Sequence, residues 1–170
     1  MLDRRDIIRR IENVGHRLQG AYDVVAVGGT SLALHGLKEQ TRDVDFIVER
    51  GDLLKFADAY KGLYDGIIHL AEPGTCFSIY MPSDYLSYAN LVGAFGSVNL
   101  YALGMLDTII TKSTRLNSRD RNDLQGCMDV NTEELLSRIS DYTLKAGHMD
   151  NVKAALVGVF KMPRVDLDAL

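Results

Sequence analysis

The spacing of apolar residues predicts an alternation of helices and strands over the first hundred residues. A helical period indicates helices at residues 3–19, 32–37 and 52–61. Short apolar or alternating runs indicate strands at residues 24–27, 43–49, 67–71, 76–81 and 98–101. Pro73 and Gly74 stand where a type II turn places them, which predicts a hairpin between residues 67–71 and 76–81.

The pattern becomes helical after residue 103. Four segments carry it: residues 103–112, 119–128, 131–145 and 150–160. Strands that come early and helices that come late predict an α/β fold with a mixed sheet flanked by helices and a helical C-terminal part. We expect an α/β domain at residues 1–128, with C-terminal helices at residues 129–170 packed on it as a single structural unit.

Candidate chemistry concentrates between residues 24 and 49. Two glycines and two hydroxyl residues follow the first predicted strand: Gly28, Gly29, Thr30 and Ser31. The short spacer to the second strand makes these two strands neighbours near the centre of the sheet. Because side chains two apart in a strand share a face, Asp43 and Asp45 project together, opposite the apolar side chains of that strand.

Two adjacent carboxylates repel each other and raise their own pKa values unless a cation lies between them. A hard divalent ion such as Mg²⁺ accepts carboxylate ligands and holds phosphate oxygens in turn. Glycine N–H groups at a helix start can bind phosphate from the other side. The segment therefore predicts a site for a metal and a phosphate.

Two other interpretations of this segment are less consistent with the sequence. A Gly-Gly pair is often no more than a tight turn, and paired acids are often a solvated strand face, but their combination with a helix-length spacer favours the functional interpretation. A dinucleotide-binding fingerprint needs G-x-G-x-x-G. The run from Gly28 lacks the second and third of those glycines, so this class is excluded.

These motifs resemble the nucleotidyltransferase fold family. Gly28-Gly29-Thr30 followed by Arg42-Asp43-Val44-Asp45 is similar to its glycine and paired-acid motif. A second patch, with Leu106, Asp107 and Lys112 and then Arg119-Asp120-Arg121-Asn122-Asp123, is similar to its later helical elements. The nearest resemblance is to small nucleotidyltransferase-like proteins related to the AbiEii and MenT toxin groups.

The resemblance implies a metal-dependent transfer of a nucleotide from a nucleoside triphosphate to an RNA, protein or small-molecule acceptor. It assigns Asp43 and Asp45 to metal binding, with Mg²⁺ or Mn²⁺ as the cofactor. Catalytic positions would be Asp43, Asp45, Lys112 and Asp123. Nucleotide-binding positions would be Gly28, Gly29, Thr30, Ser31 and Arg42. The segment from Arg119 to Asp123 could equally be a salt-bridged surface turn.

The composition of the chain restricts its possible partners and its location in the cell. The chain has 170 residues and a formal net charge of -4, so general attraction to nucleic acid is not indicated and RNA contact would need a local basic patch. Cys76 and Cys127 lack metal-type spacing, which fits a reducing cytosol. The charged start and the absence of a long apolar run predict a cytoplasmic protein without a membrane segment. The oligomeric state stays open.

One departure from the family pattern keeps two functions open. Active enzymes of this fold usually carry a third carboxylate on a neighbouring strand, and residues 76–81 contain no acid. Glu72 and Asp84 flank that segment but fall in predicted turns. The first hypothesis is an active nucleotidyltransferase, and the alternative is a non-catalytic nucleotide- or partner-binding protein, such as a toxin–antitoxin component.

Overall fold

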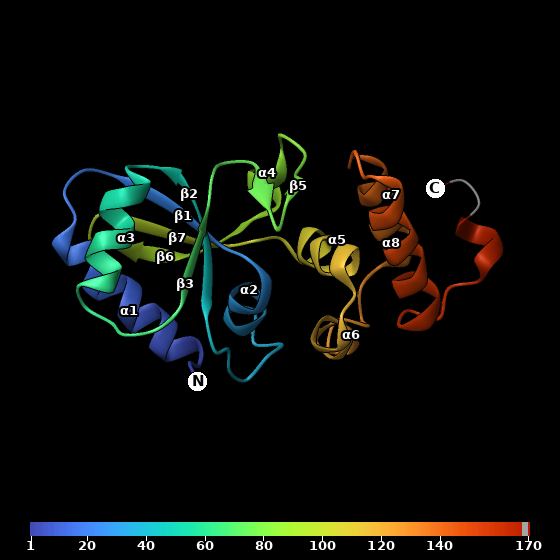
Figure 1. The fold of residues 1–170 in the computed structure, drawn as a ribbon, viewed down its shortest axis with the longest axis horizontal. Helices are drawn as coiled ribbons and strands as arrows, with labels where there is room; N and C mark the ends of the chain where they lie inside the picture. Colours follow the sequence, from blue (N-terminus) through green and yellow to red (C-terminus); the bar gives the residue numbers. More distant parts are fainter. Residues whose placement is uncertain (168–169) are drawn as a thin grey trace.

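A mixed sheet in the order β3-β2-β1-β7-β6 forms the centre of the N-terminal part (Figure 1). The structure is a computed structural model that describes residues 1–167 and 170. The strands of this sheet are β1 (Tyr22–Ala26), β2 (Val44–Arg50), β3 (Ile68–Ala71), β6 (Asn90–Phe95) and β7 (Val98–Ala102). β1 pairs antiparallel with β2 and parallel with β7, while β3 runs parallel to β2. The α/β fold with a mixed sheet is therefore confirmed, including the adjacency of the two motif-bearing strands.

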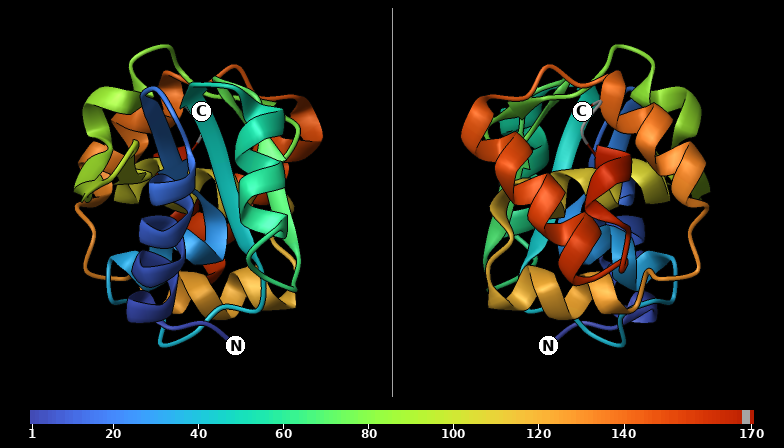
Figure 2. Two further views of the ribbon diagram at one scale, coloured as in Figure 1. Left: turned by 90° about the vertical axis from the view of Figure 1, so that its left-hand side faces the viewer. Right: turned by 90° about the vertical axis from the view of Figure 1, so that its right-hand side faces the viewer.

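Two helices cover one face of the sheet, α1 (Arg4–Arg17) and α3 (Leu53–Lys61), seen in front in the left view of Figure 2. Asp3 begins α1 through a capping box in which it accepts from the Asp6 N–H at 2.8 Å. Asp52 caps α3 by accepting a single hydrogen bond from the Lys55 N–H at 3.0 Å. Apolar side chains of both helices pack on Val24, Phe46 and their neighbours to form one core.

The opposite face of the sheet is covered by α2 (Gly28–Leu34) and by helices from the second half of the chain. These are α5 (Met105–Arg115), α6 (Ser118–Gln125), α7 (Thr132–Ser140) and α8 (Ala146–Gly158), followed by a short 3-10 turn at Arg164–Leu167. Val25 and Ile47 share a buried cluster with α5, α7 and α8. The helical C-terminal part is confirmed, whereas the division at residue 128 stays a prediction.

The predicted hairpin between residues 67–71 and 76–81 is wrong. The turn itself forms, because Gly74 has a φ of 70° and the Thr75 N–H donates to the Glu72 carbonyl at 3.1 Å. β3 nevertheless pairs with β2, and the following residues form a separate two-stranded sheet, β4 (Thr75–Cys76) and β5 (Ile79–Tyr80). A short helix, α4 (Tyr85–Tyr88), leads on to β6, a strand that the apolar pattern did not indicate.

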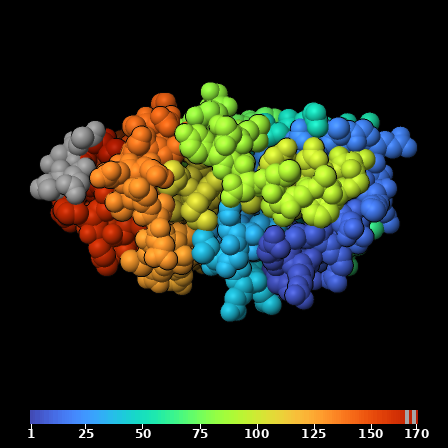
Figure 3. Space-filling model, turned by 180° about the vertical axis from the view of Figure 1, so that it is seen from behind, coloured from blue at the N-terminus to red at the C-terminus, as the bar shows by residue number. Residues whose placement is uncertain are grey.

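Smaller shifts affect the elements around the glycines. The helix expected at residues 32–37 begins earlier, at Gly28, so the glycines lie in its first turn. Seen from behind in Figure 3, the segment between α2 and β2 lies between the N-terminal elements at one end and α7 and α8 at the other. Among the residues that the structure describes, no helix has the length and apolar character needed to cross a bilayer.

A buried ion pair joins α5 to α7. Asp107 accepts from Arg138 Nε at 2.8 Å and from Nη2 at 3.2 Å, and both residues are almost completely buried. Tyr142 donates its hydroxyl to the same carboxylate at 2.7 Å. Burial by itself would lower the pKa of Arg138, but the bonds to Asp107 and Asp84 outweigh it and raise that pKa. The guanidinium thus keeps its charge and orients α7 on α5.

Replacing Arg138 by leucine should lower the free energy of unfolding by about 3–5 kcal/mol, because it removes one partner of a buried ion pair and leaves the other without it in the core. Urea denaturation at pH 7 measures the loss. Arg9→Ala is the control, since the pair of Arg9 with Asp6 lies on the surface and its removal should change little. A loss no larger than that of the control would contradict a stabilising role for the buried pair.

Candidate functional site

The chain turns from β1 into α2 at a position that requires glycine. Gly28 has a φ of 57°, and a Cβ atom there would lie 2.8 Å from Cζ of Phe77 and 3.2 Å from Oδ2 of Asp45. The Val27 N–H donates to the Asp45 carbonyl at 3.0 Å, which ties this turn to β2. The glycine thus allows the start of α2 to lie directly against the acidic end of β2.

Thr30 and Ser31 lie behind this turn and do not line the pocket. The Thr30 hydroxyl accepts from the Asp45 N–H at 3.0 Å, and the Ser31 hydroxyl donates to the Leu103 carbonyl at 3.0 Å. Both side chains are completely buried. The structure therefore gives these hydroxyls a positioning role towards β2 and α5, and the phosphate contact expected of them from the sequence stays a prediction.

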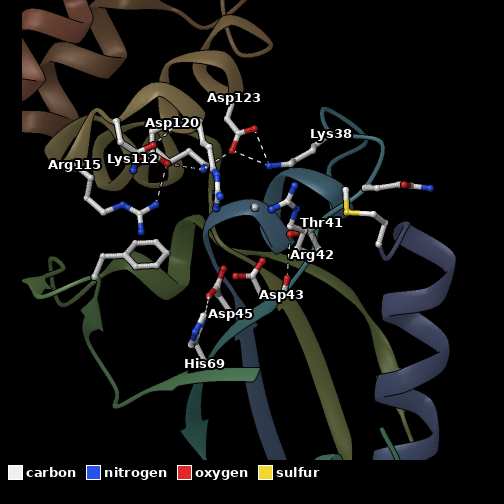
Figure 4. Close-up of a pocket in the computed structure, with 16 residues that line it drawn as sticks. Lys38, Thr41, Arg42, Asp43, Asp45, His69, Lys112, Arg115, Asp120 and Asp123 are labelled. Atoms are coloured by element: carbon white, nitrogen blue, oxygen red, sulfur yellow. Dashed lines mark hydrogen bonds and ion pairs between the residues drawn. The ribbon is translucent and has the colours of Figure 1, made fainter. Parts of the chain in front are cut away.

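The two predicted acids lie together at one wall of a pocket of about 590 Å³ (Figure 4). This volume falls within the range of small-molecule sites. Burial raises the pKa of Asp45, and the nearby charge of Asp43 raises it further, whereas a hydrogen bond with His69 opposes the shift. Burial is the largest of these causes, so repulsion between the two acids contributes less than the sequence suggested.

His69 is a pocket residue that sequence reasoning missed. It lies opposite Asp45 in the register of β3 and β2, and its Nδ1 is 2.8 Å from Asp45 Oδ1. The strands beside β2 are therefore β3 and β1, and residues 76–81, expected from the sequence to neighbour the acids, belong to a separate sheet. The place beside Asp45 holds an imidazole.

The wall across from the paired acids is built from α5, α6 and the segment after α2 (Figure 4). Lys112 Nζ lies 3.1 Å from Asp120 Oδ1 and 2.7 Å from Asp123 Oδ2. Lys38 reaches the same Asp123 at 2.8 Å, and Arg115 reaches Asp120 at 2.9 Å. Lys112 and Asp123 therefore lie in the same pocket as Asp43 and Asp45, as expected.

The pKa values of Asp45 and Asp123, which lie on opposite walls, are shifted in opposite directions. Burial would raise the pKa of Asp123, but hydrogen bonds from Lys112 and Lys38 outweigh it, so the pKa lies below its ordinary value. Asp120 is buried as well, so the surface-turn interpretation of this segment does not hold for it. Among the described residues, neither Asp43 nor Asp45 forms an ion pair with a lysine or arginine.

The remaining expected residues divide between the pocket and the protein interior. Gly29 and Arg42 line the pocket, whereas Gly28 is buried beneath it. Besides His69, the sequence analysis missed Lys38, Phe77 and Arg115 as lining residues. Within the described part of the chain, no group of three or more His, Cys, Asp or Glu side chains is arranged to hold a metal ion. A metal here would have two protein carboxylates.

Asp123 should make the stability of the protein sensitive to acid. Because its folded-state pKa lies below the ordinary value of 3.8, its ion pairs contribute in full above that value and are lost as the pH falls through the lower pKa. Asp123→Asn should be less stable than the wild type at pH 7, and the difference should shrink as the pH falls below 3.8.

Urea midpoints measured over a pH series test this expectation. Asp58→Asn is the matched control, because Asp58 is exposed on α3 and forms no ion pair in the described structure. It should follow the wild-type curve throughout. A difference between Asp123→Asn and the wild type that stays constant with pH would contradict the assignment of these ion pairs.

Comparison with known families places this geometry in context. Residues 5–159 match the model of a family described as a nucleotidyltransferase of unknown function (DUF6036). Searches of curated proteins and of solved structures gave no match. A kinship with the AbiEii and MenT groups stays a prediction from the two motifs. Since the family model spans most of the chain and every lining residue of the pocket except Met1, the chain belongs to this nucleotidyltransferase family.

Proposed function

We propose that this protein is a metal-dependent nucleotidyltransferase that binds a nucleoside triphosphate in the pocket between β2 and α5. The acceptor would be an RNA, a protein or a small molecule. One observation carries the proposal: two carboxylates that form no ion pair with lysine or arginine among the described residues face a wall rich in lysine and arginine across a single pocket, with His69 beside Asp45. In nucleotidyl transfer the protein mainly positions the reactants and neutralises their charge, and this arrangement suits both tasks.

Asp43 and Asp45 are the residues that would hold Mg²⁺ or Mn²⁺. Mg²⁺ in proteins is commonly bound by one or two carboxylates, with substrate phosphates and water completing its ligands. A pair of acids is therefore sufficient for a metal that arrives with a triphosphate. When bound, the ion would neutralise charge on the phosphate oxygens. Thr30 holds the backbone of Asp45 in place, and His69 holds one of its carboxylate oxygens.

The triphosphate would lie along the opposite wall. Five basic side chains line the pocket against four aspartates: Lys38, Arg42, Lys112, Arg115 and Arg119. A chain with a net charge of -4 thus concentrates positive charge at one place. Lys38 lies beside the glycine turn, because a Cβ atom on Gly29 would be 3.5 Å from its Nζ. We infer that Lys38 and the Gly29 backbone would share a phosphate group.

Asp123 would act through the two lysines that it holds. Its carboxylate lies between Lys38 and Lys112 and keeps both ammonium groups close together. Because Asp120 also binds Lys112, that lysine stays paired even when Lys38 turns towards a phosphate. In this proposal Lys112 and Asp123 serve catalysis by fixing positive charge beside the leaving pyrophosphate.

The alternative function is nucleotide or partner binding without turnover, as in one member of a toxin–antitoxin pair. The observation that favours it is the imidazole of His69, which stands on the strand beside Asp45 where active relatives of this fold usually carry an acid. An imidazole can orient Asp45 but cannot add negative charge to a metal site. Binding and turnover therefore need separate tests.

We expect the protein to bind a non-hydrolysable nucleoside triphosphate only when Mg²⁺ or Mn²⁺ is present. Asp45→Asn should weaken this metal-dependent binding by about tenfold or more, because it removes a ligand charge. Isothermal titration of both proteins with and without metal measures the effect, and Asp58→Asn should behave as the wild type. Equal affinity under all four conditions would overturn the proposed site.

Release of pyrophosphate from a nucleoside triphosphate, with RNA and protein acceptors, tests turnover. We expect slow, metal-dependent release that falls about 100-fold in Asp43→Asn, which is the scale of losing one charge-stabilising group. Release that is unchanged in Asp43→Asn would exclude this pocket as the catalytic centre. Binding without any release would favour the alternative function.

A further inference from the structure

The hairpin of β4 and β5 contains an aromatic residue whose backbone conformation is rare for residues other than glycine. Phe77 and Ser78 have φ values of 48° and 68°, and they form the two-residue connection between the strands. Such a turn needs positive φ at both central residues and normally uses asparagine, aspartate or glycine. Strained residues of this kind gather at functional sites, which directs attention to the side chain of Phe77.

The body of the protein holds this hairpin tightly. Cys76 and Ile79, the paired residues on either side of the turn, are buried in the core beneath the sheet. Gly74 accepts a hydrogen bond from the Met81 N–H at 2.9 Å and closes the base of the hairpin. The position of Phe77 is therefore fixed by its neighbours.

Phe77 lines the pocket at the end where the paired acids lie. Its ring contacts the first turn of α2, since a Cβ atom on Gly28 would meet Cζ at 2.8 Å. The guanidinium of Arg115 lies over the ring, with its carbon 3.6 Å from the ring centroid. Asp120 accepts a hydrogen bond from Arg115 Nη2 at 2.9 Å, so the guanidinium is held both across its face and at its edge.

Arg115 stays partly exposed in this arrangement. Its side chain remains 36% exposed, although the Phe77 ring covers one side of the guanidinium plane and Asp120 binds one of its nitrogens. A planar cation such as guanidinium stacks well on a nucleobase, and aromatic rings do the same. Lys38 and Lys112 of the same pocket are instead point charges suited to phosphate.

We propose that Phe77 and Arg115 form the platform on which the nucleobase of the triphosphate stacks. This inference rests on the proposed function and adds the part of the substrate that the paired acids and lysines leave unaccounted for. Because every nucleobase has a π-face, a stacking platform distinguishes nucleotides from inorganic polyphosphates and discriminates little between bases. The strained turn at Phe77 has a role in this proposal, since it places the ring beneath Arg115.

Binding of a nucleoside triphosphate compared with inorganic tripolyphosphate isolates this contact. Both ligands carry a triphosphate, and only the first has a ribose and a base, so the Phe77 variants below identify the share of the base. Titrations of the full chain in Mg²⁺ would use tripolyphosphate and non-hydrolysable analogues of one purine and one pyrimidine nucleotide. The wild type should bind both nucleotides about tenfold or more tightly than tripolyphosphate, which corresponds to the stacking of one base.

Phe77→Ala should lose about tenfold in affinity for both nucleotides and leave tripolyphosphate binding unchanged. Phe77→Tyr keeps an aromatic face and should bind as the wild type. Tyr80→Ala is the matched control, because Tyr80 lies on the same hairpin, is 78% exposed and does not line the pocket. Arg115→Lys keeps the charge but removes the plane, so it should reproduce the loss if Phe77→Ala fails to fold.

Three other binding results would contradict either the platform or the proposed function. If the wild type binds tripolyphosphate as tightly as the nucleotides, no base contact exists and the platform is overturned, while the proposed function stands. If Phe77→Ala weakens tripolyphosphate and nucleotides equally, Phe77 only orients Arg115 towards phosphate, and the platform is again overturned. If the wild type binds neither ligand with Mg²⁺, the proposed function itself fails.

Discussion

The buried ammonium group of Lys112 is the charge on which the geometry of the pocket depends. Lys112 is only 2% exposed, and an ammonium removed from water is tolerated when it is paired and hydrogen-bonded. Asp120 and Asp123 supply that pairing, which fixes α6 against α5. Asp123 then binds Lys38 from the segment that leads into β2. One buried cation thus sets the distance between the helical wall and the strand that carries the paired acids.

Sequence reasoning located the parts of the site whose signals are local. Strand geometry predicted that Asp43 and Asp45 would share a face. The structure begins β2 at Val44, so Asp43 lies just before the strand, and both acids nevertheless line one pocket. Lys112 and Asp123 could be assigned to the same site through the resemblance of two motifs. No apolar pattern would have brought them together, since they are distant in the chain from the paired acids.

The rest of the site could not be predicted because it depends on strand pairing between segments that are distant in the sequence. The turn through Gly74 was predicted correctly, but the partner of β3 is β2, and a turn carries no information about which strand lies alongside. His69 was missed for that reason, because its relation to Asp45 exists only across the β2–β3 register. The positive φ of Phe77 was equally hidden, since phenylalanine gives no signal for a backbone position that favours glycine.

The pocket shows how the surroundings of an aspartate determine its role. Asp123 is surrounded by ammonium groups that hold its pKa down, so its charge is already balanced within the protein. Asp45 is buried beside Asp43 without such a partner, and its pKa is raised, so the charged form is costly until a cation arrives. Opposite shifts in neighbouring carboxylates are the pattern by which roles are divided in catalytic sites. The wall of ion pairs therefore organises the site, and Asp43 and Asp45, which have no lysine or arginine partner among the described residues, are left to bind what the protein does not itself provide.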